Sequence, residues 1–428
     1  MKKTMVSLAA ASLIVTSAMA ADKGIDIVTT GQAVVYYETH QSNGTNDNIP
    51  ATGDTKLFDQ QSSNANVGVQ LNLDADLKNN FTFGSQLTYL GTMGLEKNLV
   101  GAVKQGGGVT TTSDARDQIA LTKIFVAKKI GNTTVKLGRQ ELPKSLSPFA
   151  FSEGWNVFKN TFDAALLVNT DIPDTTVVGA YVGGGNSSTN IQNLTDLEGG
   201  AVDGTAYMLT VANKSIPMTA ITLTYYNLAN VTAFTAGENG LAAYWADAKV
   251  AGKDLPMGLK IGLQGGMMSP EDSAWASTTA LGAEVSLAPI DALTVALAYT
   301  SVDGDDNKAE MAIKNTGGIK TPLYTQMVYN QDAIKVDANT FMVKGVYNTG
   351  DYGKIIAQYA GTTAGKSNAM NTGRDTTGTD YGEFDLIYKI KASGVQYFAA
   401  YVNRSWSTAN AATMDNDNIV RLWARLNF

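Results

Sequence analysis

The sequence lacks cysteine altogether and contains a single histidine, His40. Without thiols it can form neither disulfides nor thiolate metal sites, and one imidazole cannot build a histidine metal cluster. Proline is scarce, with 9 residues, and only 17% of the residues are charged, where about a quarter is usual. The formal net charge of −7 argues against nucleic acid as a partner. Beyond the N-terminal segment there is no run of about 18 apolar residues, so no membrane-spanning helix is expected.

Residues 1–20 have the features of a secretory signal peptide. A cationic start precedes a mostly apolar stretch, and Ala18-Met19-Ala20 fits the small-x-small pattern of a cleavage site. We therefore expect export by the Sec route, cleavage of the signal peptide, and a mature chain, 21–428, that forms a single domain. The alternative, in which residues 5–19 form a buried first helix, fits the flanking residues less well.

The residues that are abundant favour β-structure. Hydrophobic residues make up 44% of the chain, glycine is frequent with 42 residues, and no convincing amphipathic helix is found. In NVGVQLNLDADL (66–77), polar and apolar residues alternate over about eleven positions, near the length that a tilted strand needs to cross a bilayer. A turn at 78–80 separates this segment from FTFGSQLTY (81–89), which alternates in the same way. The two segments are predicted to form a hairpin.

The same hairpin pattern continues along the whole chain. Short turns are predicted at 78–80, 131–132, 171–174, 213–217, 251–256, 288–291, 348–353 and 391–394. Long polar loops are predicted at 39–64, 91–117, 141–160, 184–203, 230–238, 270–277, 303–338, 362–380 and 406–417. Eight short turns between nine long loops connect eighteen strands. Sixteen strands remain an alternative if a weaker strand, such as the one around 241–250, is a loop.

Short turns at one end and long loops at the other are typical of an outer-membrane barrel. We predict an all-β, transmembrane antiparallel barrel with short periplasmic turns and long extracellular loops. The barrel must close, because unpaired backbone groups at a sheet edge are costly in hydrocarbon. The last strand, IVRLWARLNF, should therefore pair with the first strand, around 25–38.

The alternation of side chains assigns charged residues to the lumen. In IVRLWARLNF the apolar residues share one face, which we expect to contact outer-membrane lipid, and the two arginines lie on the other. Applied along the chain, this parity predicts six charged residues of the lumen wall: Asp74, Asp76, Glu383, Asp385, Arg421 and Arg425. The negative net charge predicts a modest preference for cations, although the loops hold much of that charge.

Two neighbouring segments carry more specific motifs. KLGRQELPKSL (136–146) contains Gly138-Arg139-Gln140, and NTFDAALLVNTDIPDTT (160–176) contains Asn160-Thr161-Phe162 and Ile172-Pro173-Asp174. This pattern resembles the major outer-membrane porins of the Campylobacter type and, more distantly, the carboxylate-channel porins of pseudomonads. The resemblance implies a homotrimeric, passive diffusion channel whose third loop, about 141–160, folds into the lumen. Carboxylate specificity is not carried over, because the basic residues of this chain are scattered.

The C-terminal residue, Phe428, also carries a resemblance. A strand that ends the chain on phenylalanine looks like the assembly signal of bacterial outer-membrane proteins. This resemblance implies recognition by the barrel assembly machinery and a place in the outer membrane of a Gram-negative bacterium.

A porin needs no catalyst, but it needs charged groups at its constriction. The predicted third loop and its flanks carry both signs, and six residues are candidates for the constriction: Arg139, Glu141, Lys144, Glu153, Lys159 and Asp163. Opposed charges across a narrow pore would create a transverse field that orients water and selects dipolar solutes. The alternative is that this loop lies outside the barrel with its charges solvated.

The segment VDGDDNKAE (302–310) was compared with a calcium loop. Asp303, Asp305 and Asn307 have the spacing of the first ligands of an EF-hand. Lysine stands at 308 where glycine is required and at 314 where glutamate is required, so an EF-hand is rejected. Loose calcium binding stays open, but an acidic surface loop is the favoured interpretation. No other cofactor is expected.

Other functions fit the sequence less well than a porin for ions and small hydrophilic solutes. An enzyme on a barrel would commonly use histidine as a base, and only His40 is present, without an oxyanion motif nearby. A plugged active transporter would need a large domain before the first strand, but the first predicted strand, around 25–38, follows the expected cleavage site within a few residues. A sealed barrel that serves as an adhesin, with the 303–338 loop on its surface, is the main alternative.

Overall fold

The computed structural model describes most of residues 21–428. The described residues are 25–42, 55–95, 98–105, 118–154, 156–186, 191, 195–196, 206–229, 231, 240–305, 308–365, 380–407 and 416–428. The predicted signal peptide, 1–20, lies outside the described residues.

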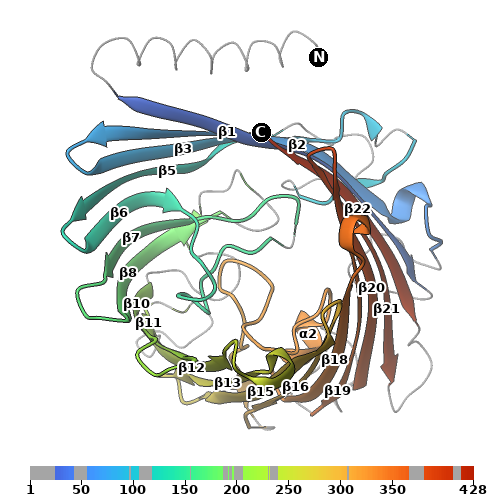
Figure 1. Ribbon diagram of the computed structural model, residues 1–428. Coiled ribbons are helices and arrows are strands. Elements are labelled where there is room, and N and C mark those ends of the chain that lie inside the picture. The colour runs from blue at the N-terminus through green and yellow to red at the C-terminus, as the bar shows by residue number, and fades with distance from the viewer. Residues whose placement is uncertain are drawn as a thin grey trace.

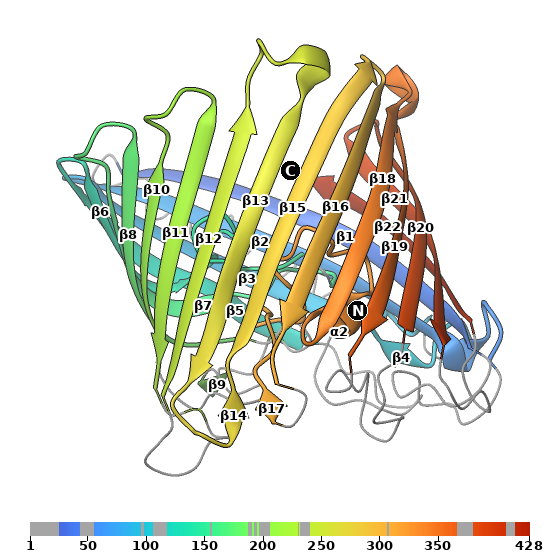
Figure 2. The same ribbon diagram turned by 90° about the horizontal axis from the view of Figure 1, so that it is seen from below.

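Eighteen antiparallel strands form one closed barrel (Figures 1 and 2). In chain order they are β1 (Asp26–Ser42), β2 (Ser63–Lys78), β3 (Phe81–Gly91), β5 (Gln118–Ile130), β6 (Thr133–Gln140), β7 (Phe162–Asn169), β8 (Thr175–Gly185), β10 (Ala206–Asn213), β11 (Thr219–Leu228), β12 (Leu241–Ala251), β13 (Lys260–Pro270), β15 (Thr278–Ile290), β16 (Leu293–Asp303), β18 (Ala338–Asn348), β19 (Lys354–Ala364), β20 (Asp380–Ala392), β21 (Val395–Ser407) and β22 (Asp417–Asn427). The predicted fold is confirmed. The alternative of sixteen strands is wrong, because the weaker segment forms β12.

Closure of the barrel depends on the pairing of β22 with β1. Their register joins Gln32 to Asn427 and Ser42 to Asp417, so the last strand pairs with the first along most of its length. The backbones of Gly31 and Phe428 extend this ladder with two hydrogen bonds of 2.6 and 2.9 Å. Among the described residues the main sheet has no edge strand with unpaired N–H and C=O groups, which is the condition for a sheet to lie in hydrocarbon.

Several short elements decorate the barrel. The two-residue strands β4 (Ala102–Val103) and β9 (Thr195–Asp196) extend the main sheet, and β14 (Trp275–Ala276) pairs in parallel with β17 (Ala309–Glu310). The helical turns are η1 (Gln60–Ser62), η3 (Pro256–Gly258), η4 (Gly350–Tyr352) and α2 (Gln331–Ile334). In the described part of the chain no helix has the length and apolar character to span a membrane.

The tightest hairpins owe their two-residue turns to residues that tolerate a left-handed backbone. Asn79 and Asn80 have φ angles of 52° and 64°, and Ser393 and Gly394 have φ angles of 51° and 82°. Such turns match the right-handed twist of the flanking strands, and asparagine and glycine adopt them at low cost. Short connections therefore gather at one end of the barrel, the short-turn end, and the long loops at the other, the loop end (Figure 2).

The outer surface of the barrel is apolar along its strands. Leu281 on β15 and Leu297 on β16 are 69% and 59% exposed, whereas Thr300, on the opposite parity of β16, is 1% exposed. The same contrast recurs on strands around the barrel, where large leucine, isoleucine and tyrosine side chains remain uncovered. A contiguous apolar belt of this kind is unfavourable in water and favourable in a bilayer.

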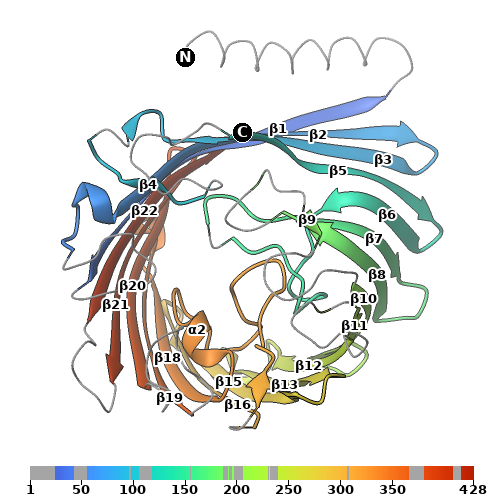
Figure 3. The ribbon, with the colours of Figure 1, turned by 180° about the vertical axis from the view of Figure 1, so that it is seen from behind.

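Two of the long connections lie inside the barrel (Figures 1 and 3). They are the third loop, 141–160, between β6 and β7, and the seventh loop, described for 308–337, between β16 and β18. Both contribute to one buried apolar cluster with the inner wall of β7 to β16. Its members include Leu142 and Phe149 of the third loop, Ile313, Leu323 and Ile334 of the seventh loop, and Val182, Tyr226 and Trp245 of the wall.

This arrangement differs from the sequence expectation of an exposed 303–338 loop. Ile313, Leu323 and Ile334 are at most 2% exposed, since the apolar inner wall covers them. The inner wall of these strands would otherwise face water, so the loops and the wall bury each other's apolar surface.

Candidate channel lumen

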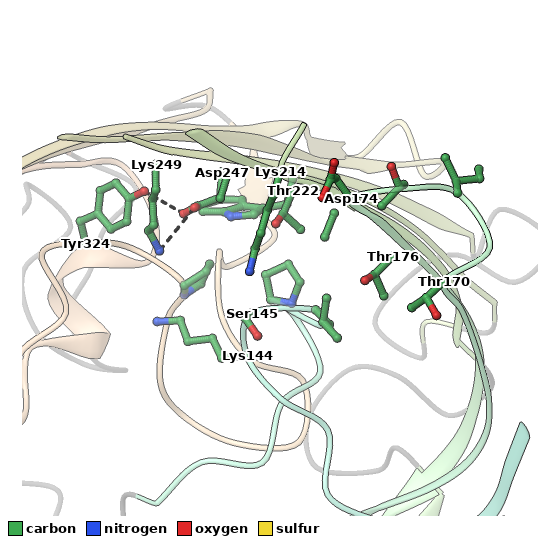
Figure 4. A pocket seen from close by; sticks show the side chains of 18 of the residues that line it. Lys144, Ser145, Thr170, Asp174, Thr176, Lys214, Thr222, Asp247, Lys249 and Tyr324 are labelled. Atoms are coloured by element: carbon green, nitrogen blue, oxygen red, sulfur yellow. Dashed lines mark hydrogen bonds and ion pairs between the residues drawn. The ribbon is translucent and has the colours of Figure 1, made fainter. Parts of the chain in front are cut away.

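A cavity of about 1000 Å³ opens inside the barrel beneath the third and seventh loops (Figure 4). Its lining includes the turns after β7 and β10, at Asp174 and Lys214, so the cavity lies toward the short-turn end. Lys144 reaches it from the third loop and Tyr324 from the seventh, and Asp247 belongs to β12. Wall and loops thus enclose it together.

Asp247 is held from two sides within this cavity. Tyr324 donates a hydrogen bond of 2.7 Å to Asp247 Oδ2, and Lys249 Nζ lies 3.4 Å from Oδ1 (Figure 4). Asp247 and Lys249 share a face of β12 because they are two residues apart. No carboxylate of the described residues lies within ion-pair distance of Lys144 or Lys214. The lining contains three lysines, Lys144, Lys214 and Lys249, and two aspartates, Asp174 and Asp247, so its net charge is +1 when all five are ionised.

Lys144, which was predicted at the constriction, lines this cavity. Its Nζ donates a 3.0 Å hydrogen bond to the carbonyl of Thr321, in the seventh loop. Partial desolvation within the lumen and the ammonium of Lys249 lower the pKa of Lys144 to about 8, against the opposing effect of Asp247. Lys144 is thus a cation whose charge changes near neutral pH.

A second charged group connects the third loop with the wall. Glu141 accepts hydrogen bonds from Lys123 of β5 at 2.6 Å and from Lys159 at 2.9 Å. Burial raises the pKa of Glu141, but these two ammonium groups outweigh it and hold the pKa below its usual value. Glu141 and Lys159, both predicted constriction residues, are therefore brought together within the barrel.

A β-bulge in β5 directs Lys123 inward, which the sequence does not predict. Gln86 of β3 pairs with Lys123 and Leu87 pairs with Leu121, which leaves Thr122 as the extra residue. Strict alternation from Leu121 would point Lys123 outward, but the extra residue turns it to the side of Gln86. No local signal in the segment marks the bulge.

Arg139 and Asp163 were predicted at the constriction, and the structure pairs them elsewhere. Arg139 on β6 donates from Nε to Asp163 Oδ1 at 2.8 Å, and its Nη2 bonds the other carboxylate oxygen. Arg139 is in register with Asp163 on one side and with Ile124 on the other. Residues in register share a face, and Ile124 is exposed on the outer face. The pair therefore has the outward parity of Leu137 at the loop end, where the side chain of Arg139 is 5% exposed and that of Asp163 is 44% exposed.

Glu153 was also predicted at the constriction, but it is buried between the two inner loops. Only 3% of its surface is exposed. Its Oε1 accepts the backbone N–H of Ile319 at 2.9 Å, and its Oε2 accepts that of Lys320 at 3.0 Å. Glu153 therefore joins the third loop to the seventh loop and does not face the cavity.

Two predicted lumen-wall residues support the seventh loop. Glu383 and Asp385, both on β20, face inward but are fully buried. Glu383 accepts the backbone N–H of Tyr329 at 2.8 Å, and Asp385 accepts Gln358 Nε2 at 2.6 Å and the N–H of Val328 at 3.4 Å. Their carboxylates serve as docking points for a loop, so they do not line free solvent.

The two predicted arginines of β22 also point inward. Arg425 donates a hydrogen bond of 2.6 Å to Gln32 Oε1 and one of 2.9 Å to the carbonyl of Val157 in the third loop. Arg421 Nη2 donates a hydrogen bond of 2.7 Å to the hydroxyl of Tyr329, in the seventh loop. Each arginine thus contacts one of the inner loops.

Glu38 on β1 gathers buried polar groups at the seam between the first and last strands. It is 0% exposed. Its carboxylate accepts from Tyr36 OH at 2.6 Å, from Lys104 Nζ at 2.6 Å and from Arg421 Nε at 2.7 Å. The single histidine, His40, lies 2.8 Å from Glu38 through Nε2 and is itself buried.

The remaining predicted residues lie at the ends of strands. Asp74 and Asp76 are exposed near the short-turn end of β2, where Asp76 accepts the backbone N–H of Lys78 at 2.8 Å. Phe428 packs its ring over Gly31, where a β-carbon would overlap it. Its role as an assembly signal stays a prediction.

The calcium candidates divide between described and undescribed residues. Asp303 ends β16 and is exposed, Asp305 follows it, and Asn307 lies outside the described residues. Where the chain is described, no three carboxylate or histidine side chains gather to form a metal site. Calcium binding stays a prediction.

The fold is similar to solved structures of proteins from Pseudomonas aeruginosa. OccK8 (OprE) of Pseudomonas aeruginosa has a TM-score of 0.70 and 13% identity, covering 94% of this chain and 98% of that one. OpdK of P. aeruginosa with vanillate has a TM-score of 0.69 and 11% identity, and OccK2 (OpdF) of the same organism in complex with glucuronate has 0.68 and 11%; both cover 94% of this chain and 98% of theirs. No protein-family model and no curated protein matches the sequence. At such low identity the likeness establishes the fold.

Proposed function

We propose that this chain is a porin of the Gram-negative outer membrane, through which ions and small hydrophilic solutes diffuse passively. The carrying observation is a closed barrel with an apolar exterior around a cavity of about 1000 Å³ lined by lysine and aspartate side chains. Barrels of about 16–18 strands are wide enough to leave an aqueous passage. The fold of the pseudomonad structures and the Campylobacter-type motifs near the third loop support the same function.

The sign of ion selectivity is part of the proposal. The net charge of −7 favours cations, which was the expectation from the sequence. Within the cavity, however, three lysines, at 144, 214 and 249, outnumber two aspartates, Asp174 and Asp247. Charges that line a pore act on ions more strongly than charges on outer loops. We propose that the cavity lysines decide the sign, in favour of small anions; the solutes in two of the similar structures, vanillate and glucuronate, are carboxylates.

Recording single-channel currents in a planar bilayer under a salt gradient tests the function. The purified mature protein is expected to insert with discrete conductance steps, in groups of three if it is the homotrimer that the resemblance implies. The reversal potential should have the sign of anion selectivity. A protein that inserts, stays folded and conducts no current would contradict the channel and favour the sealed adhesin instead.

The pH dependence of selectivity should reveal Lys144. Its pKa of about 8 means that the side chain is charged at about pH 7 and largely neutral at about pH 9. Raising the pH across this interval should therefore shift the reversal potential of the wild type toward cations. In Lys144→Met the potential at the lower pH should already resemble the wild type at the higher pH. Ser145→Ala, a neutral change on the same loop, is the matched control.

A pH response that survives unchanged in Lys144→Met would show that another group titrates in the passage. Equal potentials in wild type and variant at both pH values would show that the cavity of Lys144 is not part of the ion path.

A further inference from the structure

The third and seventh loops are joined by a network of buried hydrogen bonds. Glu153 accepts the amides of Ile319 and Lys320 and also Asn315 Nδ2, the last at 3.1 Å. Its own amide donates to Asn160 Oδ1 at 2.8 Å, so the carboxylate is held firmly in the third loop. A buried carboxylate with three donors is stable, whereas each donor would be left unsatisfied without it.

The backbone on both sides of Glu153 strengthens the same joint. Asn315 accepts the amide of Phe151 at 2.8 Å and donates to its carbonyl at 2.7 Å, so one side chain satisfies both backbone groups. Further along, Asn160 Nδ2 donates to the carbonyl of Gly317 at 3.0 Å. Gly318 leaves room for the carboxylate of Glu153, because a β-carbon there would overlap it.

The seventh loop is fixed at its far side to the opposite wall. Tyr329 is bound through its amide to Glu383 of β20 and through its hydroxyl to Arg421 of β22. Lys320 Nζ donates to the carbonyls of Met327 and Val328 at 3.0 and 2.6 Å, which braces the segment between the joint and this anchor. The chain of contacts therefore runs from β20 and β22 through the seventh loop to the third loop.

We propose that Glu153 is a positioning residue, which fixes the third loop to the seventh so that the two loops form one body inside the barrel. The third loop is then held in place both by β6 and β7, where it begins and ends, and, through the seventh loop, by the wall of β20 to β22. These contacts together determine the width of the passage beside the third loop. This inference rests on the proposed channel function for its consequence on transport. The physical joint itself is independent of transport.

A reversible crosslink tests this joint. The chain has no cysteine, so the double variant Glu153→Cys with Gly318→Cys offers one thiol pair. A β-carbon at 318 would lie 2.2 Å from Glu153 Cδ. Because Cδ is two bonds from Cβ, the two β-carbons lie within a range that includes the separation of about 3.8 Å found in disulfides. The reduced form lacks the carboxylate joint, whereas the oxidised form replaces it with a covalent bond.

In the reduced form we expect a higher single-channel conductance, more current noise and passage of larger neutral sugars than in the wild type. Oxidation should restore the wild-type values, and reduction should abolish them again. A purely structural effect of the substitutions would not reverse with the redox state. Asp332→Asn removes a partly exposed carboxylate of the seventh loop that pairs with Lys335, away from the joint, and should leave conductance unchanged.

A second variant and a second readout keep the inference testable if the double variant folds poorly. Gly318→Ala should push the carboxylate of Glu153 aside and raise conductance in the same direction. Hydrogen exchange at the amides of Ile319 and Lys320 should accelerate in Gly318→Ala and in the reduced double variant. A conductance that is the same in reduced, oxidised and wild-type forms, or altered equally in both redox forms, would overturn the positioning role. A wild type without conductance would instead reject the channel, while unchanged exchange rates would reject the joint.

Discussion

Replacing Glu38 by glutamine is expected to lower the free energy of unfolding of the barrel by about 3–5 kcal/mol. Glu38 is fully buried between Lys104 and Arg421, and it compensates both cations through hydrogen bonds of 2.6 and 2.7 Å. An amide at this position cannot neutralise two buried positive charges. The site lies where β1 meets β22, so the loss acts on the seam that closes the barrel. Urea unfolding in lipid vesicles, followed by tryptophan fluorescence, measures the change.

The same strand supplies a matched control. Asp26, at the start of β1, pairs with Lys78 at 2.8 Å, but both side chains are largely exposed, at 78% and 45%. Water screens exposed pairs so that they contribute little to stability, and Asp26→Asn should therefore unfold close to the wild type. If Glu38→Gln unfolded at the same urea concentration as Asp26→Asn, the buried contacts of Glu38 with Lys104 and Arg421 would not be a main source of stability.

Removing the inner part of the seventh loop should increase the single-channel conductance several-fold. The amide of Ile313 donates to the carbonyl of Lys335 at 2.8 Å, so the chain enters and leaves this inner segment at adjacent points. Residues 314–334 can therefore be replaced by a short turn without moving β16 or β18. The excision removes Tyr324, which lines the cavity. It also removes the residues of the seventh loop, such as Ile319, that bind Glu153 of the third loop. Conductance and the largest neutral sugar that enters loaded liposomes measure the result.

Shortening a turn outside the lumen controls for the effect of excision itself. The connection 252–259 between β12 and β13 projects from the short-turn end (Figure 2), and replacing it with a two-residue turn should leave conductance near the wild type. An excision variant of the seventh loop that folds and conducts like the wild type would show that this loop does not narrow the passage.

Much of the barrel could be derived from local sequence patterns. Period-two alternation located strands such as 66–77, and asparagine- or glycine-containing turns such as 78–80 and 391–394 located the hairpins. These signals are local, because side-chain parity and turn geometry depend on a few neighbouring residues. The same parity directed Glu383 and Arg421 inward, where the structure places them. It could not show that both are covered by a loop.

The predicted constriction residues show where such reasoning ends. The alternation of side chains in the sequence assigned no inward or outward side to Arg139. The pairing of β6 with β5 and β7 gives Arg139 and Asp163 the outward parity. Lys123 was missed because one extra residue at Thr122 reverses the parity that follows it. Glu153 has the charge expected of a pore residue, yet its carboxylate accepts hydrogen bonds from backbone amides of a loop that lie 166 and 167 positions away in the sequence.

The sequence by itself thus determined that the chain forms an antiparallel barrel with an apolar outer face, closed between its first and last strands, and it favoured eighteen strands over sixteen. Only the tertiary structure decided which loops fill the lumen and which charges remain free to meet solutes. The physical reason is that strand alternation is a property of each segment alone. The position of an inner loop depends on buried contacts, such as that of Glu153 with Ile319, between segments far apart in the chain.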